Sequence, residues 1–104
     1  MMAPYSIHIE RAAHKSRKKL PGHVRQRIKR LIDSLAQEPR PYHSQPLDVS
    51  DLDVPENIEL RRIRIEKWRI IYAVNDGDRW VWIWGIRQRP PYDYHDLPDF
   101  ADSL

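Results

Sequence analysis

Apolar and polar residues alternate near the start of the chain and predict a β-strand there. Over residues 5–10 (YSIHIE) every second side chain is apolar, which is the period of a strand with one buried face. Residues 12–20 are largely helix formers and end at Pro21-Gly22, a pair that stops a helix and turns the chain. A second helix follows and ends before Pro39; its apolar residues recur at helical spacing, at Val24, Ile28, Leu31, Ile32 and Leu35.

Three closely spaced strands predict an antiparallel sheet in the second half of the chain. Residues 58–65, 68–75 and 79–87 are rich in Ile, Val, Trp and Tyr. Glu66-Lys67 makes the turn of the first hairpin, and residues 75–78 (NDGD) supply the turn of the second. The three tryptophans of the last strand share one face and are expected to pack the sheet against the two helices; they are Trp80, Trp82 and Trp84.

Two stretches lack a regular pattern. Residues 39–57 hold four prolines and four acidic residues and are expected to form a long loop. Residues 92–104 follow Pro90-Pro91 and are expected to form an acidic tail with about a turn of helix. The pattern as a whole predicts an α+β fold, in which an N-terminal strand and a helical hairpin pack on an antiparallel sheet.

Length and composition predict one domain over residues 1–104. A chain of 104 residues that is 40% hydrophobic has enough apolar side chains for one core. It has no cysteine, so a disulfide framework and a thiolate nucleophile are excluded, and a reducing interior fits. No signal peptide and no apolar run of membrane-spanning length is present, so the expected location is the cytoplasm and no membrane partner is expected.

Charge is sorted along the chain, and this points to a polyanionic partner. Residues 1–30 carry a net charge of +8 and residues 61–92 carry +5, whereas residues 31–60 carry −6 and residues 93–104 carry −4. A basic sheet and helix beside acidic loops suggest a polyanion approached from one side. The alternative is that the lysines and arginines of the helices are simply solvated.

Arginines on the predicted strands are the candidate binding groups. If Ile63 and Ile65 face the core, then Arg62 and Arg64 lie together on the opposite face. Arg69 opens the neighbouring strand close to Arg64. The end of the last strand adds Arg87 and Arg89 to this patch if the strand of Arg69 is central. Such a patch repels itself unless an anion occupies it, and the planar guanidinium suits phosphate.

Aromatic residues beyond the patch suggest that the polyanion is single-stranded RNA. Tyr92 and Tyr94 follow the last strand directly and are able to stack on an unpaired base. His95 lies beside them and is a candidate RNA contact and proton donor. The five histidines have no metal-ligand spacing, so no metal site is expected; they are His8, His14, His23, His43 and His95.

Three segments resemble the RelE branch of the RelE/ParE toxins of bacterial type II toxin-antitoxin systems. They are residues 62–65 (RIRI), 68–72 (WRIIY) and 85–94 (GIRQRPPYDY). The order of elements, a strand, two helices and a three-stranded meander, is also similar over essentially the whole chain. The resemblance implies a metal-independent endoribonuclease that enters the ribosomal A site, cleaves messenger RNA and is neutralised by a cognate antitoxin in a hetero-oligomer.

The resemblance also implies roles for individual residues. Arg62 and Arg64 would activate the ribose 2′-hydroxyl or stabilise charge, and Arg69 would bind the scissile phosphate. Arg87 would act on the leaving oxygen, and Tyr92, or else Tyr94, would stack a base. Additional RNA contacts are expected from Arg61, Arg89, Tyr94 and His95. Arginine is a poor general base because it stays protonated; the expected chemistry needs positioning and fixed positive charge, with no cofactor.

Two other functions remain open. The ParE branch has the same scaffold and inhibits DNA gyrase without catalysis, and a plain RNA-binding module would use the same arginines without cutting. The arginines at positions 62, 64, 69 and 87 favour cleavage. In either toxin branch, an acidic antitoxin segment is expected to wrap the basic helices or to cover the arginine patch.

Overall fold

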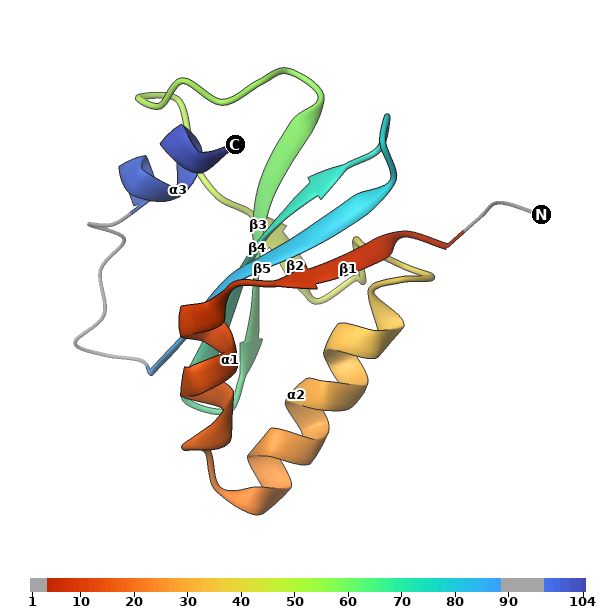
Figure 1. Cartoon of the computed structure of the whole chain (residues 1–104), viewed down its shortest axis with the longest axis vertical. Coiled ribbons are helices and arrows are strands. Elements are labelled where there is room, and N and C mark those ends of the chain that lie inside the picture. Colours follow the sequence, from red (N-terminus) through yellow and green to blue (C-terminus); the bar gives the residue numbers. More distant parts are fainter. Residues whose placement is uncertain (1–3, 89–96) are drawn as a thin grey trace.

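The computed structural model describes residues 4–88 and 97–104 and has the predicted α+β fold (Figure 1). Its elements in chain order are β1 (Ser6–Ile9), α1 (Arg11–Lys18), α2 (Gly22–Ser34), β2 (Ser44–Pro46), β3 (Ile58–Ile65), β4 (Trp68–Asn75), β5 (Trp80–Gln88) and α3 (Leu97–Ser103). The predicted order of a strand, two helices and an antiparallel meander is confirmed. None of the described helices is both long enough and apolar enough to cross a membrane.

The strands form one five-stranded sheet in the order β1-β5-β4-β3-β2. The hairpins make β3, β4 and β5 antiparallel neighbours, and the two helices return the chain so that β1 lies parallel to β5. β4 is therefore the central strand, with a paired neighbour on each side. From the sequence, Arg69 was predicted to have arginines on both sides if its strand were central, and β4 has that position.

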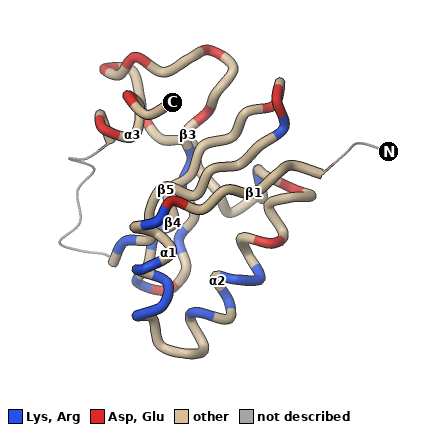
Figure 2. The backbone as a smooth tube through the Cα atoms, viewed as in Figure 1, with Lys and Arg blue, Asp and Glu red and all other residues tan. Residues whose placement is uncertain are grey.

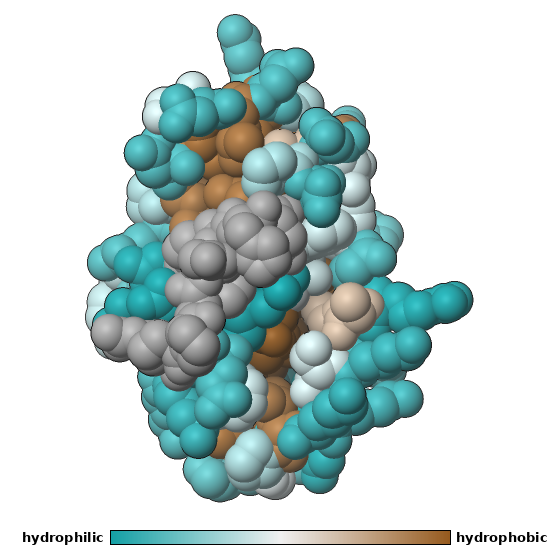
Figure 3. Space-filling model, turned by 90° about the vertical axis from the view of Figure 1, so that its left-hand side faces the viewer, coloured by the Kyte–Doolittle hydropathy of each residue, from teal (hydrophilic) through white to brown (hydrophobic). Residues whose placement is uncertain are grey.

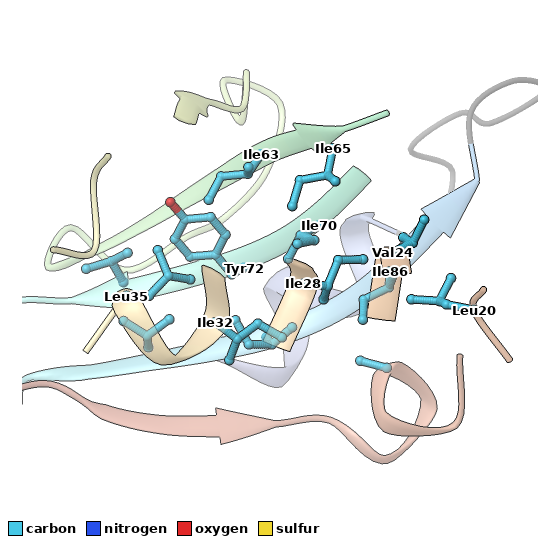
Figure 4. Close-up of a cluster of buried hydrophobic side chains, with 14 residues drawn as sticks. Leu20, Val24, Ile28, Ile32, Leu35, Ile63, Ile65, Ile70, Tyr72 and Ile86 are labelled. Atoms are coloured by element: carbon cyan, nitrogen blue, oxygen red, sulfur yellow. The ribbon is translucent and has the colours of Figure 1, made fainter. Parts of the chain in front are cut away.

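Helices α1 and α2 cover one face of the sheet and form the main core with it (Figure 4). Val24, Ile28 and Ile32 recur every four residues, so they lie on one side of α2, and all three are buried. Opposite them, the sheet contributes inward side chains at alternate positions, such as Ile63 and Ile70. Burying each of these large aliphatic side chains stabilises the fold by about 1.5–3 kcal/mol.

The opposite face of the sheet is covered at one end by α3. Phe100 of α3 is fully buried, and its ring stacks on Trp84 with centroids 4.6 Å apart and planes 9° from parallel. Trp82 meets Phe100 edge to face at 5.6 Å. The expectation that the tryptophans pack against the first two helices is wrong, because Val81 and Ile83 take that face and alternation sends the tryptophans to the other one.

The long loop contains a short strand that the sequence did not predict. β2 pairs antiparallel with β3 and places Gln45 opposite Arg62. It is only three residues long and ends in Pro46, which a sheet tolerates at an edge strand. Apolar residues from the rest of the loop pack beside α3, namely Leu47, Val49, Leu52 and Val54.

An ion-pair network joins the start of β1 to the turn between β4 and β5. Arg40 donates from Nη1 and Nη2 to the two carboxylate oxygens of Asp76, at 3.0 and 2.8 Å, and from Nε to Glu59 at 2.8 Å. The Tyr5 hydroxyl donates to Asp76 at 2.6 Å. Hydrogen bonds from Arg40 and Tyr5 lower the pKa of Asp76. Four segments that are distant in sequence are thereby held together at this end of the sheet.

Candidate nucleic-acid interface

Three arginines lie side by side across the middle strands of the sheet. In the strand register Arg64 of β3 is opposite Arg69 of β4, and Arg69 is opposite Arg87 of β5. Neighbouring strands are about 4.8 Å apart, so the three backbone positions lie within roughly 10 Å. Arg62, two residues before Arg64 on β3, is on the same face. We call these four residues the arginine face; the register confirms the predicted placement of Arg62, Arg64, Arg69 and Arg87 on one side of the sheet.

The arginine face shares one side of the sheet with the apolar cluster under α3. Leu60, Ile71 and Ala73 lie on that same side and are buried. The side of the sheet opposite α1 and α2 is thus divided, with apolar residues toward one end and arginines toward the other. In the side view of Figure 3, apolar surface appears in patches bordered by hydrophilic residues.

Basic residues from other elements gather near the same end of the molecule. Figure 2 shows Lys and Arg concentrated over α1, α2 and the lower ends of the middle strands, while most Asp and Glu lie at the opposite end, over α3, the long loop and the β4–β5 turn. The charge sorting seen along the sequence is therefore also a sorting in space. A polyanion would be drawn to the end that carries the arginine face.

A β-bulge places Arg87 on this face. Ile71 is paired with Gly85 but the next residue, Tyr72, is paired with Ile83, so Trp84 is an extra residue in β5. Strict alternation after Trp84 would have turned Ile86 outward and Arg87 toward the helices. With the bulge, Ile86 is buried in the main core and Arg87 faces the same side as Arg69.

The arginines differ in their surroundings. Arg62 is half-buried and donates from Nη2 to the amide oxygen of Gln45 at 2.7 Å. Arg64 is exposed, whereas Arg69 and Arg87 are half-buried. Partial burial thins the water around a guanidinium and strengthens its attraction for an anion.

Arg61 does not join the arginine face. Its side chain is only 11% exposed, and it donates from Nε and Nη2 to the Ser44 hydroxyl at 3.0 and 2.8 Å and from Nη1 to Glu59 at 3.0 Å. Alternation along β3 turns it to the side of the sheet that α2 covers. Arg61 therefore fastens β2 to β3 and lies on the opposite side of the sheet from the arginine face.

Four of the predicted site residues lie outside the described residues. They are Arg89, Tyr92, Tyr94 and His95. Base stacking by Tyr92 or Tyr94 and the RNA contacts of Arg89 and His95 stay predictions.

The chemistry available to the arginine face is anion binding and charge stabilisation. Each guanidinium donates paired hydrogen bonds to phosphate oxygens and cannot accept a proton near neutral pH. Within residues 4–88 and 97–104, no three His, Asp or Glu side chains are grouped as a metal site would require.

Two residues that were not predicted from the sequence position the arginine face. Gln45 accepts a hydrogen bond from Arg62, and Gly85 leaves space for the side chain of Arg87. A glycine inside a predicted strand often marks a bulge or a close approach, so Gly85 could have been singled out from the sequence.

Comparison with known proteins places this chain in a family of toxins. Residues 7–89 match the model of a family described as the ParE toxin of the type II toxin-antitoxin system parDE. A comparison with curated protein sequences finds no significant match.

Solved structures with the same fold are RelE toxins. RelE in the archaeal RelE–RelB complex from Pyrococcus horikoshii is 25% identical, with a TM-score of 0.74 over 86% of this chain and 99% of that one. A chain of the RelBE2 complex from Mycobacterium tuberculosis is 21% identical, with a TM-score of 0.63 over 83% and 99%. The isolated RelE toxin of E. coli is 18% identical, with a TM-score of 0.61 over 96% and 99%. At such identities the last two establish likeness of fold alone.

Proposed function

This chain belongs to the ParE toxin family, within the RelE/ParE superfamily of type II toxin-antitoxin toxins, and we propose that its arginine face binds messenger RNA on the ribosome and cleaves it. The observation that carries the proposal is the register that puts Arg64, Arg69 and Arg87 opposite one another. Arginines on neighbouring strands present a row of paired hydrogen-bond donors, and a chain of phosphates offers acceptors at a matching series of positions.

Arg69 is proposed to bind the scissile phosphate because it lies between the other two. The 2′-oxygen attacks the phosphorus in line, the bond to the 5′-oxygen breaks, and a cyclic phosphate and a free 5′-hydroxyl result. Negative charge builds on the phosphorane oxygens, and fixed guanidinium groups stabilise it without rearranging.

Arg62 and Arg64 are proposed to act on one side of Arg69, and Arg87 on the other. On β3, the pair stabilises the 2′-oxygen as its proton leaves, and water takes the proton because an arginine does not. On β5, Arg87 donates a hydrogen bond to the 5′-oxygen as it departs, and this oxygen takes its proton from water. The ribosome, rather than the toxin, would hold the RNA in the geometry for in-line attack. Because translating ribosomes are its target, the site of action is proposed to be the cytoplasm.

The second candidate is inhibition of DNA gyrase without catalysis. The family model that matches residues 7–89 is that of ParE toxins, and this favours the candidate. The arginine face favours RNA cleavage, because gyrase inhibition requires no row of phosphate-binding groups. A plain RNA-binding module would bind messenger RNA and leave it whole.

One experiment separates these functions. Purified protein is added to translating ribosomes and the 5′ ends of the messenger are mapped, while a parallel sample is tested for inhibition of supercoiling by gyrase. Cleavage is expected to yield new ends within the codon held in the A site, with supercoiling unaffected. Inhibited supercoiling with intact messenger would support the ParE-like function instead.

We also propose that a cognate antitoxin neutralises this protein in a hetero-oligomer. The similar structures from Pyrococcus horikoshii and Mycobacterium tuberculosis are toxin-antitoxin complexes. An acidic segment of the antitoxin would cover the arginine face or wrap the basic side of α1 and α2. Copurification with the product of the neighbouring gene tests this; a toxin that is expressed freely, without arresting growth and without a partner, would contradict it.

A further inference from the structure

The loop before β2 presents an aromatic pair beside the arginine face. Tyr42 is 99% exposed, and no other large apolar side chain in residues 4–88 and 97–104 stands so far into solvent. Its ring meets that of His43 edge to face, with centroids 5.3 Å apart and planes at 66°. An exposed tyrosine contributes nothing to the core, and its ring is available for stacking on a group outside the chain.

Tyr42 and His43 line an open hollow whose other walls are polar. Gln45, Arg62 and Arg64 complete a space of about 410 Å³. The hydrogen bond from Arg62 to Gln45 fixes one wall. A volume of this size lies within the range of small-ligand sites, and among the described residues that line it Tyr42 is the one large hydrophobic side chain.

A second hollow continues from the first toward α2. It measures about 230 Å³ and is lined by Arg27, Arg30 and Leu31 of α2 together with His43, Arg64 and Ile65. Arg27 also forms an ion pair with Glu66 in the turn after β3, at 3.1 Å. Because His43 and Arg64 border both hollows, the arginine face, the aromatic pair and the basic side of α2 form one continuous surface.

This combination fits single-stranded RNA better than a protein partner. Guanidinium groups at two walls bind phosphate, a protruding aromatic ring stacks on a base, and an amide pairs with base or sugar edges. A protein interface of this size would have more apolar side chains around its aromatic anchor. The strand order also leads from β5 through β4 and β3 to β2, so RNA that crosses the arginine face reaches the aromatic pair next.

We propose that Tyr42, His43 and Gln45, with Arg62 and Arg64, form a binding subsite for the RNA nucleotide next to the scissile phosphate. The base stacks on Tyr42, and Arg64 holds a phosphate that the subsite shares with the arginine face. The proposal rests on the proposed function. It adds which residues bind the nucleotide that flanks the scissile phosphate and by which contacts. Tyr42 has no part in the bond-breaking step.

The test uses short RNA oligomers that carry 2′-O-methyl groups and therefore cannot be cleaved, with the fluorescent base 2-aminopurine at one position at a time. Stacking on Tyr42 is expected to quench one position in the wild type. Tyr42→Ala is expected to restore that fluorescence and to weaken binding about tenfold, while Tyr42→Phe keeps both properties. Because Tyr42 is fully exposed, neither change should affect folding, and circular dichroism checks this.

The possible outcomes separate this proposal from the proposed function. If Arg69→Ala weakens RNA binding but Tyr42→Ala changes neither quenching nor affinity, the subsite is wrong and the arginine face stands. If Tyr42→Ala leaves RNA binding unchanged and weakens antitoxin binding instead, the loop is a protein contact and the subsite is wrong. If the wild type neither binds the oligomers nor cleaves messenger on ribosomes, both proposals fall.

Discussion

The side chain of Arg87 lies over the backbone of Gly85, in the space that a side chain at position 85 would occupy. A β-carbon there would be 2.8 Å from Arg87 Nε, closer than side-chain contacts allow, and 3.3 Å from Nη2, which is an unusually tight contact. Gly85 is also the residue at which the bulge in β5 restores the pairing with β4. One glycine therefore sets both the direction and the position of the arginine that we assign to the leaving oxygen.

Gly85→Ala is expected to displace the guanidinium of Arg87 and to leave the fold intact. Because the atom in the way belongs to a flexible side chain, the free energy of unfolding should change by no more than about 1 kcal/mol. A displacement of about 1 Å should reduce cleavage of ribosome-bound messenger roughly 10- to 100-fold. Gly22→Ala is the matched control, since a β-carbon at position 22 meets nothing within 4 Å. Full activity of Gly85→Ala would refute this role of the glycine.

Most of the elements, but not the bulge, were predictable from the sequence. The strands at residues 58–65 and 68–75 have the predicted bounds, because alternation and turn residues agree there. That agreement was enough to place Arg62, Arg64 and Arg69 together. The position of Arg87 depended on a break in alternation that only the pairing of β5 with β4 reveals. The presence of Gly85 indicates that a bulge could occur in β5, but it does not show which residue is the extra one.

Contacts between distant segments account for the other differences. The tryptophans of β5 were expected against α1 and α2, but the C-terminal segment supplies Phe100 as their partner. β2 has no hydrophobic pattern, and it is a strand because its backbone pairs with the edge of β3. Arg61 was expected to be an additional RNA contact, but its side chain is hydrogen-bonded to Ser44 and Glu59. Each case depends on tertiary neighbours that local periodicity does not encode.

Phe100→Ala is expected to destabilise the protein by about 3 kcal/mol. The ring is fully buried and contacts Trp82 and Trp84, so its removal leaves a cavity and ends the attachment of α3. Urea denaturation followed by tryptophan fluorescence measures the change. A loss below about 1 kcal/mol would mean that α3 contributes little to the apolar end of the sheet.

Tyr72→Phe is expected to lower the free energy of unfolding by about 1 kcal/mol. The buried hydroxyl donates to the carbonyl of Pro39 at 2.8 Å, and its loss leaves that acceptor without this donor. Burial also raises the pKa of Tyr72, in keeping with a neutral hydroxyl. Thermal or urea unfolding measures the effect, and the exposed Tyr42→Phe is the control that should change nothing.

Asp76→Asn is expected to weaken the network around Arg40 in a pH-dependent way. Hydrogen bonds from Arg40 and Tyr5 lower the pKa of Asp76 below its usual 3.8, so the folded state binds its proton less readily than the unfolded state does. The contribution is therefore complete above 3.8 and is lost as the pH falls through the lowered pKa. Since the carboxylate is 56% exposed, about 1 kcal/mol is expected at neutral pH.

Unfolding curves at decreasing pH measure this contribution. The difference between wild type and Asp76→Asn should shrink toward zero in acid, whereas Asp51→Asn in the exposed loop should show no difference at any pH. A gap between wild type and Asp76→Asn that stays constant in acid would show that the lost energy is steric and not electrostatic.

The rate at which Arg69 variants cleave ribosome-bound messenger in a single turnover tests most directly whether the arginine face is a ribonuclease site. Arg69 lies between Arg64 and Arg87, so Arg69→Ala should slow cleavage at least 100-fold. Arg69→Lys should be intermediate, because a lysine keeps the charge without the paired donors. Arg25→Ala, on the exposed side of α2, should cleave like the wild type. Cleavage by Arg69→Ala within about twofold of the wild-type rate would contradict the account.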